Sequence, residues 1–504
     1  MKKLIIASLV LICSATIGAQ AQIPNFKHII VVVQENRTPD NLFQGLCSAP
    51  FGSITGCSTT PGPGQYNVQT SNWLDKTSST GVTQPRKVTL ANTYDLDHSH
   101  TGFNEMCDMV GGTCKMDGAA GISCNPQTGT TCPGSPQFKF VINKKGILNP
   151  YLQLATQYGW ANYMFQTNQG PSFPAHQFLF GATSAPTTQD DGLGIYASEN
   201  MLKTGGTGGT NVVAGCTALA KTQVKVIMPD GTENTTTFPC FEHQTLGDML
   251  DAAPGPGPTV GISWRYYAPS LGSIWTAPNA IRHICEPSGP NGDCMGQVFM
   301  DHVDIPTKIQ PPPPGAPMGS VDILTDVSSC NLRQVSWVIP SCQNSDHASC
   351  NDGGGPSWVA SIVNAVGKAA TCDGGTGYWN DTAIVITWDD WGGWYDHEAP
   401  TILPPPFGGY QYGFRVPMIF VSAYTPPAYI NNNRHDFGSI VKFIQRNFGL
   451  TEGGLMFADQ RSKTNLAEFY DLTQPPRTFQ TVTASRPASF FLKDKRKMLD
   501  PDDQ

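Results

Sequence analysis

Charged residues are scarce in this 504-residue chain, at 14% against about 25% in an average globular protein. So low a fraction argues against a coiled coil, and 39% apolar with 10% aromatic residues argues against intrinsic disorder. Basic residues are too few for a general nucleic-acid binder, because the formal net charge is −8 and such proteins need a positive surface. We therefore expect a folded, loop-rich protein with no nucleic-acid partner.

Long apolar runs are also missing after the first 22 residues, since nothing later reaches the roughly 18 consecutive apolar residues of a transmembrane helix. At the start, Lys2 and Lys3 precede an apolar stretch over residues 4–19, and Ala19-Gln20-Ala21 is a small-x-small cleavage motif. This pattern predicts a signal peptide over residues 1–21, cleaved after Ala21. We expect a secreted or periplasmic protein with no stable membrane span.

Cysteine pairs with the CxxC or zinc-site spacing are absent, although the chain has 15 cysteines. Cys13 lies in the predicted signal peptide, and the remaining even number favours disulfide bonds in an exported chain. Short local bridges are the simplest pairings where two cysteines lie close in the sequence. The predicted bridges are Cys47–Cys57, Cys107–Cys114, Cys124–Cys132, Cys285–Cys294 and Cys342–Cys350.

Compact apolar runs alternate with loops rich in glycine, proline and serine, and no internal repeat is visible. Three runs, residues 27–34, 382–388 and 416–422, are typical of strands that are buried on both faces. Helical patterns cover residues 357–368 and 438–448. Strands of this kind alternating with helices predict an α/β fold with a central, mostly parallel sheet flanked by helices.

Long polar segments interrupt this pattern at residues 48–81, 107–136 and 205–239. Because they are rich in cysteine, glycine and proline, we interpret them as insertions held by disulfides rather than as separate domains. We expect a single α/β domain with insertions over residues 22–472 and a C-terminal extension over residues 473–504.

Acidic and amide side chains follow the first two of the three predicted strands. Glu35 and Asn36 come after the first strand, and Asp389 and Asp390 come after the second, followed by two glycines that permit close backbone approach. Parallel sheets bind ligands at the carboxyl ends of their strands, and adjacent carboxylates repel each other unless a cation lies between them. Helix caps and solvated loop charges are the alternative. Two such clusters at two strand ends favour a metal site.

A serine with a restricted backbone forms a third candidate element. Ser172 stands between Gly170-Pro171 and Pro174, a setting that suits an exposed nucleophile at the start of a helix, where free N–H groups can hold an anion. Considered alone, this segment fits an ordinary helix N-cap better.

In combination, these segments resemble a known family. The segments that carry the resemblance, in chain order, are IIVVVQENRTPDNLF (29–43), GPSFPAHQFLFGATS (170–184), TWDDWGGWYDHEAP (387–400) and GFRVPMIFVS (413–422). Two more matching pairs are YDLDH (94–98) with KMDG (115–118), and VSWV (335–338) with SDH (345–347). They are similar to motifs of the secreted bacterial phosphoesterases that include acid phosphatases and phosphatidylcholine-type phospholipases C, a branch of the alkaline phosphatase superfamily.

This resemblance implies an alkaline-phosphatase-like fold and a metal-dependent hydrolase of phosphate esters. The positions matched to the family's metal ligands are Glu35, Asn36, Asp389 and Asp390. Oxygen ligands of this kind suit a hard divalent metal ion. Ser172 would attack phosphorus and form a phosphoserine, and His98 and His347 would face the phosphate or the leaving group.

The chain departs from the family pattern at three places. Asp390 stands where the family often has a glutamate. After Ser172 the chain has Phe173-Pro174-Ala175-His176 where the family often reads PNR, so that an expected substrate contact is changed. His100 competes with His98 for the role of the active-site histidine, because the segment leading to KMDG is longer than the family's.

The substrate stays open between a phospholipid headgroup and a small phosphomonoester. Aromatic side chains could bind a quaternary ammonium group, and the candidates are Trp264, Tyr266, Tyr267, Trp391, Trp394 and Tyr395. An acid phosphatase needs no such group and is equally compatible. Outside catalysis, the alternative is a secreted binding protein with a structural metal, which leaves the Ser172 segment without a role. A sulfatase-like hydrolase would need a CxPxR-type motif, and the chain has none.

Overall fold

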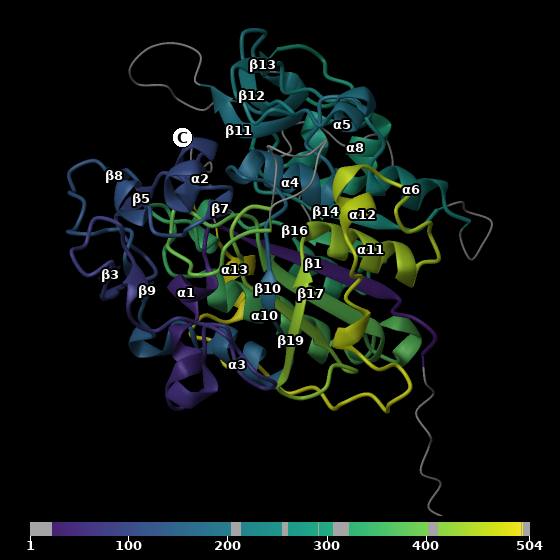
Figure 1. Ribbon diagram of the computed structural model, residues 1–504. Helices are drawn as coiled ribbons and strands as arrows, with labels where there is room; N and C mark the ends of the chain where they lie inside the picture. Colours follow the sequence, from purple (N-terminus) through teal and green to yellow (C-terminus); the bar gives the residue numbers. More distant parts are fainter. Residues whose placement is uncertain are drawn as a thin grey trace, which may run out of the picture.

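The computed structural model describes residues 23–202, 213–254, 261–290, 292–305, 322–401, 412–494 and 496. The predicted signal peptide, residues 1–21, lies outside this part of the chain. A large sheet crosses the centre of the molecule with helices around it, and smaller strands lie to the left of the sheet and above it (Figure 1). None of the helices in the described ranges is both long and apolar enough to cross a membrane.

The central sheet has eight strands in the described residues. In spatial order they are β15 (Val303–Asp304), β14 (Trp264–Tyr267), β16 (Val335–Val338), β1 (His28–Gln34), β17 (Thr382–Trp388), β18 (Met418–Ser422), β10 (Gly159–Met164) and β19 (Tyr429–His435). All neighbours pair in parallel except at β18, which runs antiparallel to both β17 and β10. The structure confirms the predicted α/β fold with a mostly parallel sheet.

Strand β1 lies in the middle of this sheet. All seven of its residues are buried, and it pairs with β16 on one side and with β17 on the other. A strand covered on both faces needs apolar side chains pointing both ways, which explains its unbroken Ile and Val run. The three predicted strands, residues 27–34, 382–388 and 416–422, are β1, β17 and β18.

The α-helices differ widely in length. They are α1 (Pro39–Leu42), α2 (His100–Cys107), α3 (Asn149–Gln157), α4 (Ser172–Gly181), α5 (Thr188–Leu193), α6 (Leu246–Ala252), α7 (Arg282–Cys285), α8 (Gln297–His302), α9 (Ile323–Ser328), α10 (Gly355–Lys368), α11 (Phe437–Asn447), α12 (Phe457–Arg461) and α13 (Ala488–Leu492). The helices predicted over residues 357–368 and 438–448 are α10 and α11.

Helices cover both faces of the sheet. Phe420 of β18 packs against Phe443 of α11, with ring centroids 5.4 Å apart, and Trp388 of β17 packs against Tyr151 of α3, with centroids 5.1 Å apart. Val385 pairs with Phe420 and lies three residues before Trp388, so Phe420 and Trp388 point to opposite faces. Helices α11 and α3 therefore lie on opposite sides of the sheet.

The other strands of the described residues form small sheets of two or three strands, in or beside the long polar segments. They are β2 (Trp73–Leu74), β3 (Val82–Thr83), β4 (Arg86–Val88), β5 (Tyr94–Leu96), β6 (Met109–Val110), β7 (Thr113–Cys114), β8 (Cys124–Pro126), β9 (Lys139–Val141), β11 (Tyr196–Leu202), β12 (Gln223–Ile227) and β13 (Thr235–Thr237).

Disulfides hold these insertions. All five predicted local bridges are present. Two further bridges, Cys216–Cys240 and Cys330–Cys372, join cysteines 24 and 42 positions apart, which closeness in sequence does not predict. Seven disulfides fit an oxidising compartment outside the cytosol, as the export prediction requires.

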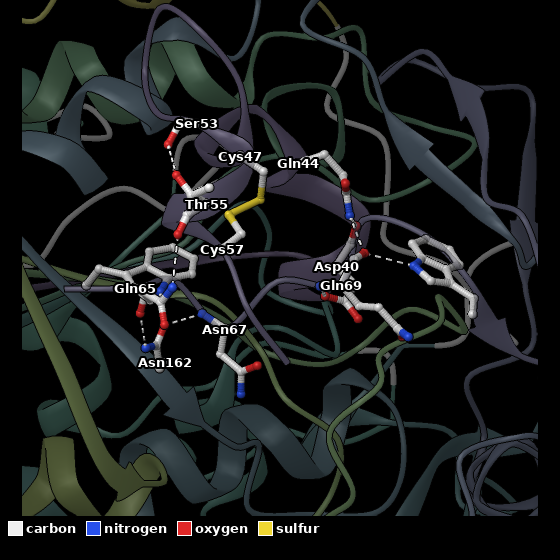
Figure 2. Close-up of a disulfide and its surroundings, with 12 residues drawn as sticks. Asp40, Gln44, Cys47, Ser53, Thr55, Cys57, Gln65, Asn67, Gln69 and Asn162 are labelled. Carbon is white, nitrogen blue, oxygen red and sulfur yellow. Dashed lines mark hydrogen bonds between the residues drawn. A yellow bond between two sulfur atoms is a disulfide. The ribbon is translucent and has the colours of Figure 1, made fainter. Parts of the chain in front are cut away.

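The first insertion shows how a loop is tied to the sheet. The Cys47–Cys57 disulfide closes its start, and Figure 2 shows this bond beside Gln65, Asn67 and Asn162. Asn162 of β10 accepts the backbone N–H of Asn67 at 2.7 Å and donates to the Gln65 carbonyl at 2.8 Å. One buried side chain of the sheet thus fixes two backbone positions of the insertion.

One hydrophobic core includes both Phe26, before β1, and Phe491, in α13. Arg477 also donates to the Thr425 carbonyl at 2.8 Å, which ties the segment after residue 472 to the sheet. The limits of the domain, 22–472, and of the extension, 473–504, stay a prediction.

Candidate active site

Strands β1 and β17 bring the two acidic clusters together. They pair in parallel to their last residues, Gln34 and Trp388, so the residues that follow leave the sheet side by side. The two chain segments stay close at Gly392. Its φ is +62°, and an added Cβ would lie 2.4 Å from the Asn36 carbonyl oxygen. Only a glycine fits both this left-handed backbone and this contact.

Asn36 links the two strand ends. Its φ is +61°, in the left-handed region that asparagine tolerates better than most residues. This conformation lets its backbone N–H donate to Asp389 Oδ1 at 3.1 Å. Unusual backbone angles of this kind concentrate at functional sites.

Ser172 is the first residue of α4 and lies against the acidic cluster. Its Oγ is 3.1 Å from Asp390 Oδ2 and 3.4 Å from Glu35 Oε2. The next residue, Phe173, donates its backbone N–H to Asn200 Oδ1 at 3.0 Å, which holds the start of the helix. The side chain is 1% exposed.

Gln166 joins the serine loop to the second strand end. Its Nε2 donates to the Gly170 carbonyl at 3.0 Å, and its Oε1 accepts the backbone N–H of Trp391 at 3.0 Å. A single buried amide thus fixes the residues next to Ser172 and Asp390 relative to each other. Gln166 was not predicted from the sequence, because nothing in its local pattern marks it.

The two predicted histidines converge on Asn36. His98 Nδ1 donates to the Leu96 carbonyl at 2.8 Å, and His347 Nδ1 donates to the Ala348 carbonyl at 2.7 Å. In both neutral rings the lone pair is therefore on Nε2. Each Nε2 lies 3.1 Å from the side-chain amide of Asn36.

His100, the competing histidine, has other partners. Its Nδ1 lies 3.3 Å from the Gln169 carbonyl, and its Nε2 lies 3.1 Å from Asn104 Nδ2. The structure therefore places His98, not His100, against Asn36.

Three buried carboxylates gather at this site, and the described residues supply no lysine or arginine partner for them. Glu35, Asp389 and Asp390 are each 0% exposed. Burial, and next the negative charge of Asp389, raise the pKa of Glu35 and of Asp390 well above their usual range. Asp389 Oδ2 is buried with no hydrogen-bond donor. Ionised, this cluster needs a cation.

The spacing of the oxygen atoms fits a metal ion. The Asn36 side chain lies 3.3 Å from Glu35 Oε2 and 3.1 Å from Asp389 Oδ1, and Ser172 Oγ is 3.1 Å from Asp390 Oδ2. A cation with bonds of about 2.1 Å holds its ligand atoms roughly 3.0 to 3.5 Å apart. The five side chains therefore fit a divalent ion.

The amide of Asn36 agrees with this interpretation. Without a cation, the amide must turn so that its nitrogen donates to Glu35 and Asp389 and its oxygen faces His98 and His347. Both imidazoles, however, present lone pairs, which need donors. With a cation among the oxygens, the amide oxygen is a ligand and the nitrogen donates to both rings, so every group is satisfied.

His176, part of the segment that departs from the family pattern, lies at the same site. Its Nε2 is 3.2 Å from Glu35 Oε1 and 3.8 Å from Asp389 Oδ2. Burial lowers the pKa of His176 to about 4. The sequence offered one signal for this position, since His176 follows Ser172 by four residues and such residues share a helix face.

Two other clusters of metal-binding residue types do not compete. Cys342 and Cys350 lie beside His347, but they form a disulfide and offer no thiolate. Asp396 belongs to the third cluster and pairs with the buried Arg415, with Nε to Oδ1 at 2.8 Å. That arginine supplies the positive charge a metal would bring.

The aromatic residues considered for headgroup binding are buried in the described structure. Their exposed fractions do not exceed the 5% of Tyr267. Trp264 stacks on His302, and Tyr395 stacks on Trp73. Tyr266 contacts a residue beside the carboxylate cluster, with Oη 3.4 Å from His176 Nδ1. Most of them stabilise the core.

Known proteins are similar to parts of this chain. Phospholipase C A of Mycobacterium tuberculosis is 27% identical over 217 residues, covering 38% of this chain and 37% of that protein. The hemolytic phospholipase C of Pseudomonas aeruginosa is 23% identical over 336 residues, covering 61% of this chain and 40% of that protein. The matches thus span about two fifths of the length of these relatives.

Among solved structures, a protein in the alkaline phosphatase superfamily from Vibrio parahaemolyticus aligns with a TM-score of 0.31 and 10% identity, covering 65% of this chain and 64% of that one. A model of the phosphoesterase family matches residues 26–451, most of the chain. The match includes every predicted site residue from Glu35 to Asp390, and the chain belongs to the phosphoesterase family.

Proposed function

We propose that this protein is an exported, metal-dependent hydrolase of phosphate esters in which Ser172 is the nucleophile. The observation that carries the proposal is the position of Ser172 Oγ, 3.1 Å from Asp390 Oδ2 at the start of a helix and within the carboxylate cluster. A purely structural metal site has no use for a hydroxyl there. This placement speaks against the alternative of a non-catalytic binding protein.

We assign the metal to Glu35, Asn36, Ser172, Asp389 and Asp390. When bound, the cation neutralises negative charge on the phosphate and lowers the pKa of the oxygen nucleophile. Side chains of the protein carry out the nucleophilic attack and the proton transfers.

In the first half-reaction, Ser172 Oγ attacks phosphorus in line with the ester oxygen. The O–P bond to serine forms, the bond to the leaving group breaks, and the serine proton passes to Asp390 Oδ2, its nearest acceptor. In the substrate complex one of the two rings, His98 or His347, carries a proton on Nε2 in place of its hydrogen bond from Asn36, and this imidazolium gives that proton to the leaving oxygen. The product is an alcohol and a phosphoserine.

In the second half-reaction, water attacks the phosphoserine. The now neutral imidazole accepts a proton from this water through Nε2, the ring nitrogen that faces the site because Nδ1 of each histidine bonds to a carbonyl. The serine O–P bond breaks, and Ser172 regains its proton from Asp390. Phosphate or a phosphorylated headgroup leaves, and the site returns to its starting state.

For the substrate, we propose phospholipid headgroup release as in a phospholipase C. The relatives named above support it, since they are phospholipases C. Hydrolysis of small phosphomonoesters, as in an acid phosphatase, is the second candidate. It is favoured by the burial of the aromatic side chains that a choline group would need.

A paired assay tests the reaction class and the substrate. The exported protein is assayed with p-nitrophenyl phosphate and p-nitrophenyl phosphorylcholine, and its metal content is measured on the same sample. Ser172→Ala should abolish turnover and keep the metal, whereas Asp389→Ala should lose both. Ser361→Ala is the matched control, because Ser361 is buried in α10 and bonds only to its own helix.

Turnover that survives both Ser172→Ala and Asp389→Ala would refute the mechanism. The ratio of the two substrate activities separates phospholipase C from phosphatase. N-terminal sequencing of the exported protein tests the predicted cleavage after Ala21.

A further inference from the structure

We propose that His176 is a metal ligand through Nε2, so that the site combines nitrogen and oxygen donors. The inference rests on the metal of the proposed function. It changes the expected cation, because an all-oxygen site suits a hard ion such as Ca²⁺ or Mg²⁺, whereas an imidazole favours Zn²⁺ and similar transition metals.

The fold places His176 at the carboxylates with little freedom to move. It lies on α4, four residues after Ser172, and both side chains point to the same helix face. His176 is 0% exposed. Its Nε2 is 3.2 Å from Glu35 Oε1 and 3.8 Å from Asp389 Oδ2.

Hydrogen bonding on the far side of the ring decides which nitrogen carries the proton. His176 Nδ1 lies 3.4 Å from Tyr266 Oη. The Tyr266 hydroxyl already donates its one hydrogen to the Trp275 carbonyl at 2.7 Å. Oη therefore acts as the acceptor, Nδ1 carries the hydrogen, and Nε2 keeps its lone pair.

This lone pair faces two acceptors. Glu35 Oε1 and Asp389 Oδ2 are carboxylate oxygens, and Asp389 Oδ2 has no hydrogen-bond donor although it is buried. When Glu35 is ionised, three lone pairs meet here without a hydrogen, and they repel one another unless a cation lies among them. The arrangement is that of an imidazole ligand whose other nitrogen is fixed by a hydrogen bond.

The carboxylate oxygens that face His176 differ from those that face Ser172 and Asn36. Glu35 Oε2 faces Ser172, and Asp389 Oδ1 accepts from Asn36, so each carboxylate has its other oxygen free for the histidine side. Separations of 3.2 and 3.8 Å are close to the roughly 3.0 to 3.5 Å expected between ligand atoms around one ion.

Metal binding by the whole exported protein tests this proposal. The metal is removed with a chelator, and Zn²⁺ and Ca²⁺ are then titrated by calorimetry into the wild type, His176→Gln and His243→Gln. His243 is the matched control, because it is also buried but bonds to Gln244 and not to the cluster. We expect His176→Gln to bind Zn²⁺ at least tenfold more weakly than the wild type and to change its Ca²⁺ affinity less than threefold. The control His243→Gln should change neither affinity.

Pulsed electron paramagnetic resonance of the Cu²⁺-loaded protein gives a second measurement. Coupling to an imidazole nitrogen should be present in the wild type and lost in His176→Gln. If that variant does not fold, His98→Gln and His347→Gln should both retain the coupling. Circular dichroism in chelator checks that each variant is folded.

The outcomes separate the two proposals. A protein that binds no divalent ion refutes the proposed function itself. A protein that binds the ion without nitrogen coupling, or with equal Zn²⁺ affinity in His176→Gln, refutes only the role of His176, which would then be a hydrogen-bond donor to Glu35.

Discussion

Replacing Gly392 by alanine should damage the active site far more than its cost in stability explains. An added Cβ would lie 2.4 Å from the Asn36 carbonyl oxygen and 2.7 Å from Asn36 Cβ. An ordinary contact begins at 3.4 Å, so Asn36 or the loop after Asp390 must move by about 1 Å. A displacement of this size at a catalytic group can cost about 100-fold in turnover, or roughly 2.7 kcal/mol.

The matched control is Gly374→Ala. Gly374 also has a positive φ, +67°, but no heavy atom lies within 4 Å of its added Cβ. Both variants share the backbone penalty of about 1 to 2 kcal/mol for a left-handed alanine. Only Gly392→Ala adds the collision with Asn36.

The assay is turnover of p-nitrophenyl phosphate and p-nitrophenyl phosphorylcholine, with metal content and thermal unfolding measured on the same samples. We expect Gly392→Ala to melt lower than Gly374→Ala, because it adds the collision with Asn36. Turnover should stay near wild type for Gly374→Ala alone. Equal turnover in the two variants would refute the reasoning, because the close approach to Asn36 would then have no role in the site.

Three further changes test the framework around the site. Arg415→Gln should lower the free energy of unfolding by about 3 to 5 kcal/mol, because the Asp396 carboxylate is left buried without its charged partner. Urea unfolding measures this change. The control Arg434→Gln, whose ion pair is half-exposed, should lose less than about 1 kcal/mol. Removing the Cys330–Cys372 disulfide opens a loop of 42 residues and should cost about 4 kcal/mol while leaving the metal content unchanged. Burial raises the pKa of Glu199 from about 4.5 to about 8, so the free energy of unfolding is highest below about pH 4.5 and falls as the pH rises towards 8. Glu199→Gln should have the melting temperature of the wild type at low pH and a higher one near pH 8. Equal melting temperatures of the two proteins at both pH values would contradict this.

The central strands could be predicted because burial leaves a clear pattern in the sequence. Residues 29–33 and 383–386 are unbroken apolar runs rich in β-branched side chains, which are typical of strands covered on both faces. The direction of β18 could not be predicted, because burial is the same for a strand that runs either way. The long-range bridge Cys330–Cys372 was missed for a related reason, since its partners meet only in the folded chain.

The carboxylates and Ser172 could be predicted at the site because motifs mark them, and the structure brings them together. Gln166 and His176 were missed as site residues. Gln166 acts by joining two loops that are neighbours only in space, and no local pattern records such a contact. His176 could be found only by applying helix geometry to a residue noted as a departure from the family.

The Cys342–Cys350 disulfide has a consequence for the cell that makes the protein. It closes a loop of eight residues around His347, whose ring is held by the Ala348 carbonyl within that loop. In the reducing cytoplasm this bond does not form, and the loop is held by its hydrogen bonds alone, such as that from Asn351 Nδ2 to the His347 carbonyl at 2.7 Å. Under the proposed function, the newly made chain would hold this imidazole less firmly before it left the cytoplasm. The producing cell's own phosphate esters would be protected by the redox state of the compartment.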